Sequence, residues 1–176
     1  MRLRHITGSE DYVAQSEYVV HEPEKNKGQW QQFFGNGHPI HVEIGMGKGQ
    51  FIEQMALTHP EINYIGIEMQ QDVLYSAAKK IAEKELKNVR LLVFDINHIE
   101  DIFGEGEVDR FYINFCDPWP KSNQKRRRLT HGNFLKCYRQ VLPMGGQIHF
   151  KTDNDKLFEW SLEEIPQFGF RLSEVT

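Results

Sequence analysis

Two short segments of this chain carry residue types that bind heterocyclic ligands. Residues 43–49 (EIGMGKG) place an acid and three glycines between an apolar run and an amphipathic stretch, where a strand turns into a helix. Such a turn needs glycine because its backbone takes positive φ angles and because Cβ atoms would keep a nucleoside away. Residues 117–121 (DPWPK) combine an acid, two prolines, a tryptophan and a lysine. We expect this stiff loop to hold a polar heterocycle between its acid and its cation.

The spacing of the glycines separates two classes of nucleotide-binding turn. A dinucleotide-binding turn follows the pattern G-x-G-x-x-G, and its third glycine lets the helix pack on the strand. Gln50 occupies that third place, so a pyrophosphate ligand is disfavoured. The spacing present, E-x-G-x-G-x-G, resembles the first motif of the Rossmann-like S-adenosylmethionine-dependent methyltransferases. The resemblance implies a methyl-donor site that includes Glu43, Gly45, Gly47 and Gly49.

Two more acids follow apolar runs farther along the chain. Glu68 ends the run 64–68, about 20 residues past the glycines, where a ribose-binding acid is expected. We expect Glu68 to bind both ribose hydroxyls, and Asp95, after the run 89–94, to accept from the exocyclic amine of an adenine. One acid alone could simply mark the end of a strand. Three acids in this order predict one shared site, because ligands of open α/β sheets bind beyond the carboxyl ends of the strands.

Hydrophobic periodicity predicts alternating strands and helices, the pattern of an α/β protein with a largely parallel sheet. Apolar runs predict strands near residues 40–44, 64–68, 89–94, 110–115 and 146–151. Apolar residues recurring at three and four predict helices near 71–86, 130–141 and 154–165, with Asp72 and Thr130 as caps of the first two. Residues 168–175 alternate as a last strand would. Together with the glycine motif, the pattern predicts a Rossmann-like class I methyltransferase sheet with helices on both faces.

Length and composition favour a single globular unit. The chain has 176 residues, 39% of them hydrophobic, which is enough for one substantial core. We predict an N-terminal arm and cover segment at 1–37, with a short helix at 29–34, and one methyltransferase domain at 38–176. No apolar run approaches the roughly 20 residues that cross a bilayer. Cys116 and Cys137 have no paired spacing, so we expect reduced thiols in a cytoplasmic protein with no membrane contact.

The distribution of charge points to a polyanionic partner. The chain has a formal net charge of −4, yet residues 121–128 hold five cations and no acid, which leaves 16 cations against 25 acids elsewhere. A protein that repels phosphate everywhere except at one basic run docks a nucleic acid in one orientation. A basic run can also be a solvated loop, but this one lies beside the predicted carboxyl edge of the sheet. We therefore expect contact with nucleic acid.

Three segments together make the resemblance specific. From residues 43–49 through 117–121 to Lys151-Thr152-Asp153, the chain is similar to the bacterial tRNA (guanine-N7)-methyltransferases, over nearly all of residues 38–176. The resemblance implies a guanine in the variable loop of tRNA as substrate and S-adenosylmethionine, which becomes S-adenosylhomocysteine, as donor. It places Asp117 at the catalytic centre. It implies the following further contacts: Glu43, Glu68, Asp95 and Asp117 with the donor, Lys121 and Asp153 with the substrate, and Asn123, Gln124, Lys125, Arg126, Arg127 and Arg128 with RNA.

The chemistry of guanine suits these residues. Guanine N7 carries an in-plane lone pair and no hydrogen, so it can attack a sulfonium methyl group without first losing a proton. Most of the acceleration would come from positioning the two reactants, which can lower a barrier by about 7–11 kcal/mol at best. An anionic Asp117 or Asp153 would offset the positive charge that the purine gains and accept from its N1 and amino hydrogens. The reaction therefore requires no metal, and His38 and His41, on either side of a proline, are not expected to bind one.

The sequence departs from the family at its far end. The family continues with a Thr-x-Tyr/Phe-Glu substrate motif and a last antiparallel strand, neither of which follows Thr176. We therefore expect a folded donor-binding half with weakened tRNA methylation, and an unpaired edge on the strand predicted at 168–175.

Two other functions remain open. An enzyme of the same fold could methylate an exocyclic amine of adenine or cytosine, since such enzymes carry an acid or asparagine followed by Pro-Pro and an aromatic; here Trp119 replaces the second proline. A non-catalytic RNA-binding protein could also retain the fold, although it would not need the donor-binding acids. The sequence is compatible with a monomer or a homodimer.

Overall fold

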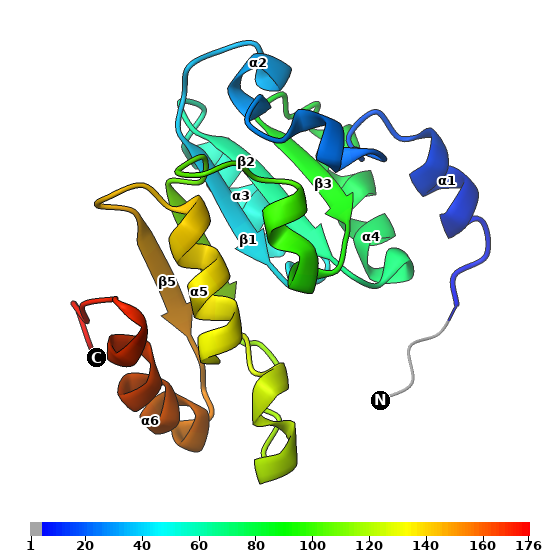
Figure 1. The fold of residues 1–176 in the computed structure, drawn as a ribbon. Helices are drawn as coiled ribbons and strands as arrows, with labels where there is room; N and C mark the ends of the chain where they lie inside the picture. Colours follow the sequence, from blue (N-terminus) through cyan, green and yellow to red (C-terminus); the bar gives the residue numbers. More distant parts are fainter. Residues whose placement is uncertain (1–4) are drawn as a thin grey trace.

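The computed structural model describes residues 5–176, and in this range five parallel strands form one sheet in the order β3-β2-β1-β4-β5 (Figure 1). The strands are β1 (Ile40–Ile44), β2 (Asn63–Glu68), β3 (Val89–Val93), β4 (Arg110–Asn114) and β5 (Gln147–Lys151). In the register of the central strands, Ile44 lies opposite both Ile67 and Ile113. All carboxyl ends therefore lie at one edge, and the five expected strands and the Rossmann-like class are confirmed.

Helices cover both faces of this sheet (Figure 1). They are α1 (Ser9–Gln15), α2 (Trp30–Phe34), α3 (Gln50–Thr58), α4 (Gln71–Glu83), α5 (Gly132–Val141) and α6 (Asp155–Glu164). Short 3-10 segments are η1 (Pro23–Asn26), η2 (Ile96–Asp101), η3 (Ser122–Arg127) and η4 (Ile165–Phe168). None of the helices within residues 5–176 combines the length and apolar character that crossing a membrane requires.

Alternate residues of each strand belong to two separate apolar layers, as the pleat of a strand requires. Val42, Ile65 and Phe111 lie in the layer that α5 and η2 cover. Tyr64 and Tyr112 lie in the opposite layer, with the buried residues of α3 and α4. Because both faces are covered, β1 is buried along its whole length, which is typical of parallel sheets.

The segment before residue 38 packs on the sheet and protects its outer edge. Val19 forms a parallel bridge with Leu91 of β3, where an unpaired edge would otherwise be exposed. The Trp30 side chain is fully buried, and its Nε1 donates to the Ile102 carbonyl over 2.7 Å. Its short helix, α2, confirms the expectation for residues 29–34. The functional division at residue 38 stays a prediction.

Two expected helix caps are wrong because distant residues take those side chains. Asp72 lies inside α4 and accepts from the Ser9 hydroxyl; Gln70 is the N-cap residue instead. Thr130 Oγ1 lies 2.7 Å from Ser161 Oγ in a buried hydroxyl pair. The N-cap of α5 is His131, whose Nδ1 accepts from a backbone N–H.

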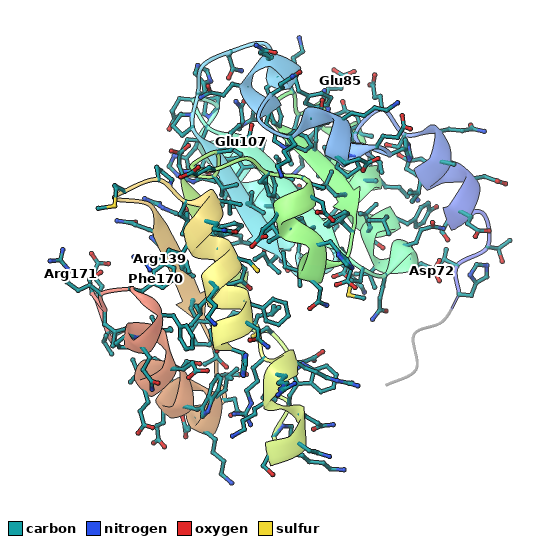
Figure 2. The ribbon with its side chains drawn as sticks, viewed as in Figure 1. Asp72, Glu85, Glu107, Arg139, Phe170 and Arg171 are labelled. Atoms are coloured by element: carbon teal, nitrogen blue, oxygen red, sulfur yellow. The ribbon has the colours of Figure 1, made fainter. Side chains whose placement is uncertain are left out.

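The strand expected at 168–175 is also wrong. Within the described chain, residues 169–176 join no strand of the sheet. Gly169 turns the chain with a φ of 88°, and a Cβ on it would meet the Arg139 side chain at 2.7 Å. Phe170 then packs against the apolar layer under α5, near Arg139 (Figure 2). The alternation of residue types in this segment therefore reflects contact with a helix, because a strand also needs a backbone partner.

Glu107 fixes the N-terminal segment to the body and yields a stability prediction (Figure 2). Its Oε1 accepts from Gly28 N over 2.7 Å and Gly104 N over 2.8 Å, and its Oε2 accepts from Trp30 N over 3.0 Å. Glu107→Gln turns one acceptor into a donor that faces an N–H group. We expect a loss of about 1–3 kcal/mol of unfolding free energy in urea titrations. Glu105→Gln, an exposed acid two residues away, is the control; equal effects of the two changes would contradict this role.

Candidate active site

The glycine turn at residues 45–49 has the conformation that its sequence predicts. Gly45, Gly47 and Gly49 have φ angles of 69°, 59° and 79°, in the region that favours glycine. A Cβ on Gly49 would also lie 2.5 Å from the Ala77 Cβ, so α3 and α4 could not pack as they do. The N–H groups of Gly45 and Met46 both donate to the Ile67 carbonyl. The turn is thus held against the end of β2.

Glu68 is fixed beside this turn by two backbone donors. Its Oε1 accepts from Gly47 N over 3.1 Å, and its Oε2 accepts from Gln70 N over 3.0 Å. Each carboxylate oxygen can accept more than one hydrogen bond, so both keep capacity for a ligand. This geometry is compatible with the predicted contact to two ribose hydroxyls.

Glu43 is a buried acid with an unsatisfied oxygen. Its side chain is 3% exposed, and Oε2 accepts from Asn114 Nδ2 over 3.2 Å. Oε1 is buried and has no partner among the residues that the structure describes. Burial raises the pKa of Glu43 to about 8; the bond from Asn114 opposes this shift and the charge of Glu68 adds to it. A ligand with an N–H or cationic group would satisfy this unpaired acceptor near the carboxyl end of β1.

Asp95 lies beyond β3 at the same edge and caps η2. Its Oδ1 accepts from the backbone N of Asn97 over 3.0 Å and from the Asn97 Nδ2 over 2.8 Å. Its Oδ2 accepts from no group in the described part of the chain. The carboxylate is therefore oriented through one oxygen, and the other could accept from an amine.

The loop after β4 holds Asp117 between two strained residues. Phe115 and Trp119 have φ angles of 54° and 44°, which are rare for bulky side chains and cost on the order of 1–3 kcal/mol each. Phe115 N donates to the Lys151 carbonyl over 2.9 Å, which ties the loop to β5, and the Asp117 side chain is exposed. Burial raises the pKa of Cys116 to about 11, so the neighbouring thiol stays protonated at neutral pH. The loop thus presents a carboxylate and no reactive thiolate.

The predicted substrate residues lie at this edge, and within the described chain no hydrogen bond or ion pair joins their side chains. Lys121 is the exposed N-cap residue of η3, and Asp153 is exposed in the turn between β5 and α6. Between residues 5 and 176, neither side chain forms a hydrogen bond or ion pair with Asp117. Among the predicted donor and substrate residues within the described chain, a side-chain hydrogen bond joins only Gly47 and Glu68, while Asp95, Asp117, Lys121 and Asp153 follow other strands.

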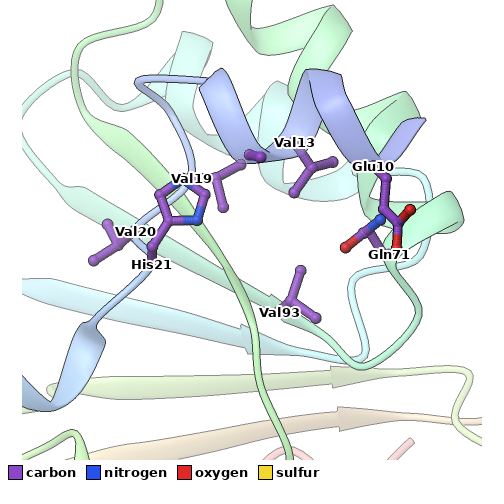
Figure 3. Close-up of a pocket in the computed structure, with 8 residues that line it drawn as sticks. Glu10, Val13, Val19, Val20, His21, Gln71 and Val93 are labelled. Atoms are coloured by element: carbon purple, nitrogen blue, oxygen red, sulfur yellow. The ribbon is translucent and has the colours of Figure 1, made fainter. Parts of the chain in front are cut away.

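Two cavities adjoin this edge. One, of about 280 Å³, touches the site through Asn114; it is lined by Phe51, Met55, Arg110, Tyr112, Asn114, His149 and Lys151. The other, of about 250 Å³, brings the N-terminal segment beside the start of α4 (Figure 3); it is lined by Glu10, Val13, Ala14, Val19, Val20, His21, Gln71 and Val93. The N-terminal segment therefore adjoins the residues that follow Glu68.

Comparison with known proteins assigns the family. A family model described as "Putative methyltransferase" matches residues 37–174. A tRNA (guanine-N(7)-)-methyltransferase from Lachnoclostridium phytofermentans is 53% identical over 176 residues, which cover 100% of this chain and 82% of that protein. The chain belongs to the tRNA (guanine-N7)-methyltransferase family.

Two further comparisons agree with this assignment. A relative of the same name from Bacillus licheniformis is 50% identical over 177 residues, which cover 100% of this chain and 83% of that protein. The solved structure titled "Structure of an Antibiotic Related Methyltransferase" superposes with a TM-score of 0.65 at 20% identity, covering 84% of this chain and 76% of that one. At that identity the likeness shows the fold alone. The resemblance inferred from the motifs is confirmed.

Sequence reasoning missed Asn114 and the double role of the basic run. Asn114 follows Ile113, the partner of Ile44 in the register, so its amide reaches the Glu43 carboxylate. The available signal for this contact was a polar residue at the end of one strand, next to a strand that carries an acid. In the basic run, Arg128 donates to loop carbonyls while Lys125 and Arg126 are exposed. No sequence pattern separates these cations.

Burial of Glu43 predicts a specific pH dependence of stability. The folded pKa of about 8 lies above the ordinary value of 4.5, so between these pH values the folded state keeps a proton that the unfolded state has released. The unfolding free energy should therefore fall from pH 5 to pH 8, by about 1.4 kcal/mol per unit of pKa difference at most. Glu43→Gln should flatten this dependence in urea titrations. The exposed control Glu159→Gln should retain it, and equal slopes for all three proteins would contradict the assignment.

Proposed function

We propose that this chain transfers a methyl group from S-adenosylmethionine to N7 of a guanine in the variable loop of tRNA. The observation that carries the proposal is the 53% identity, over the whole chain, to a relative named tRNA (guanine-N(7)-)-methyltransferase. The geometry supports it, because the acids of the two motifs and the glycine turn share one edge of the sheet.

The residues at this edge fit the donor. The glycine turn leaves backbone uncovered, and Glu43 Oε1 is a buried acceptor without a partner in the described chain. The carboxylates of Glu68 and Asp95 would repel a pyrophosphate but suit a ligand with a ribose and an amine. Glu43 would accept from a donor group of the ligand, Glu68 from the ribose hydroxyls and Asp95 from the adenine amine. Bound S-adenosylmethionine would supply an electrophilic methyl group on its sulfonium.

The loop after β4 would position the guanine. N7 carries its own lone pair, so the residues of this chain need not remove a proton, and the reaction needs no metal. Asp117 and Asp153 would accept from the N1 and amino hydrogens of the base, and Lys121 would contact the substrate as well. The negative charge of these acids would offset the positive charge that the methylated purine gains, an electrostatic effect typical of preorganised sites.

The basic run would orient the RNA. Residues 123–128 include four cations on and after η3, and the side chains of Lys125, Arg126 and Arg127 are exposed. Because the rest of the chain is acidic, tRNA would approach through this face. With tRNA as its substrate, the protein would act in the cytoplasm and would need no membrane partner. It would act as a monomer or a homodimer.

The test is product analysis of methylated tRNA. We expect the chain, incubated with unmodified bulk tRNA and methyl-labelled S-adenosylmethionine, to place the label in 7-methylguanosine, as identified by mass spectrometry after digestion. Label in an N-methylated adenosine or cytidine would instead indicate an exocyclic-amine methyltransferase. Binding of tRNA without donor binding in calorimetry and without any labelled nucleoside would favour a non-catalytic RNA-binding protein.

Replacing the carboxylate of Asp117 should lower the rate of transfer. Asp117→Asn keeps the size of the side chain but removes its charge, so we expect kcat to fall about 10²-fold, as removal of one preorganised electrostatic group does elsewhere. Single-turnover kinetics at saturating donor would measure this. Asp101→Asn, an exposed acid at the end of η2, is the control and should retain the wild-type rate. Full turnover of Asp117→Asn with normal donor binding would refute the charge argument.

A further inference from the structure

Arg128, the last cation of the basic run, binds the backbone of the loop after β4, whereas Lys125 and Arg126 are exposed and Arg127 lies over the Trp119 ring. The Arg128 Nε donates to the carbonyls of Pro118 and Trp119, both over 3.1 Å, and its Nη2 donates to the Trp119 carbonyl over 2.9 Å. These two carbonyls follow Asp117 directly in the chain. One guanidinium therefore holds the backbone of the loop that presents the catalytic acid.

The same guanidinium also contacts the helix after the neighbouring strand. Arg128 Cζ lies 4.7 Å from the centroid of the Trp160 ring in α6, a distance typical of a cation–π contact. The His131 ring stacks on the same tryptophan, with centroids 6.1 Å apart and planes at 18°. The buried pair of Thr130 and Ser161 joins the same two segments. Arg128 thus links the loop after β4 to the helix after β5.

This link joins the two segments that carry the acids proposed to hold the guanine. Asp117 lies one residue before Pro118, and Asp153 lies two residues before α6 begins. The exposed Asp117 side chain forms no ion pair within residues 5–176, and its loop contains Trp119 in a left-handed conformation. Such a conformation persists only where the surroundings impose it. The bonds from Arg128 to the carbonyls of Pro118 and Trp119 supply that restraint.

We propose that Arg128 is a positioning residue that sets the placement of Asp117 relative to Asp153, and so controls the methyl-transfer step more than the affinity for RNA. The inference rests on the proposed function for its effect on rate. The structural part of the proposal does not depend on that function: the planar guanidinium of Arg128 stacks on Trp160 and clamps the loop through its hydrogen bonds. A lysine retains the positive charge but lacks the planar guanidinium with several N–H donors in fixed directions, so it cannot replace this arginine.

Arg126 offers a matched comparison within the same run. Its side chain is exposed and has no hydrogen-bond or ion-pair partner in the described structure. It carries the same charge two residues earlier, so it is suited to contact phosphate. Arg171→Lys, at an exposed arginine outside the basic run, is the neutral control. Arg126→Ala should raise the KM for tRNA and lower the slope of affinity against salt by about one, with kcat unchanged.

The kinetic test compares Arg128→Lys with Arg171→Lys, the neutral control, and with Arg126→Ala. We expect Arg128→Lys to lower single-turnover kcat by about 10–100-fold, because displacement of a catalytic group by about 1 Å can cost that much. Its KM for tRNA, salt slope and donor affinity should stay at wild-type values. Wild-type kcat in Arg128→Lys, or a change confined to KM and salt slope as in Arg126→Ala, would overturn the proposal.

A spectroscopic test separates the clamp from catalysis. The chain has three tryptophans, so incorporation of 5-fluorotryptophan gives three ¹⁹F resonances, assigned through Trp119→Phe and Trp160→Phe. Arg128→Lys should shift or broaden the signals of Trp119 and Trp160 and leave that of the buried Trp30, which reports folding. Unchanged signals from Trp119 and Trp160 would refute the clamp. Changed signals in a chain that does not methylate guanine would retain the clamp and refute the proposed function instead.

Discussion

The parallel pairing of β1 with a strand on each side is the constraint on which this structure depends. Both neighbours, β2 and β4, run in the same direction as β1, so the three chains leave the sheet at one edge. The glycine turn follows β1, Glu68 ends β2 and the Asp117 loop follows β4, so all three lie at this edge. The strand can hold this central place because helices cover both faces of the sheet, which leaves β1 fully buried.

The site places a polar group where the fold would favour an apolar one. Glu43 lies inside a strand whose Ile40, Val42 and Ile44 belong to an apolar layer, and within the described chain only one of its oxygens accepts from a neighbouring side chain. A raised pKa reduces the cost, because a protonated carboxyl is easier to bury than a carboxylate. A binding site can thus be prepared before the ligand arrives, while the surrounding core supplies the stability.

Patterns within short stretches of sequence predicted those features of the structure that depend on neighbouring residues alone. The five strands, the glycine turn and the acids at strand ends follow from periodicity and spacing within short windows. The contact between Glu43 and Asn114 requires the register of two strands that are distant in sequence. The caps at Asp72 and Thr130 failed for the same reason, since Ser9 and Ser161 bind those side chains across 63 and 31 residues. Alternation at 168–175 could not show that no strand pairs with this segment.

The basic run illustrates why a count of charges does not assign roles. Five cations within residues 121–128 produce one positive region, and that field depends little on where each side chain points. Positioning depends on direction, because a hydrogen bond weakens steeply when its donor turns away. Arg127 stacks over Trp119 at 4.9 Å and Arg128 reaches the carbonyls of the same loop, while Arg126 remains exposed. A run proposed to attract RNA can therefore also shape the loop that carries Asp117, since electrostatic attraction requires only the charge, whereas the proposed clamp requires one arginine in one orientation.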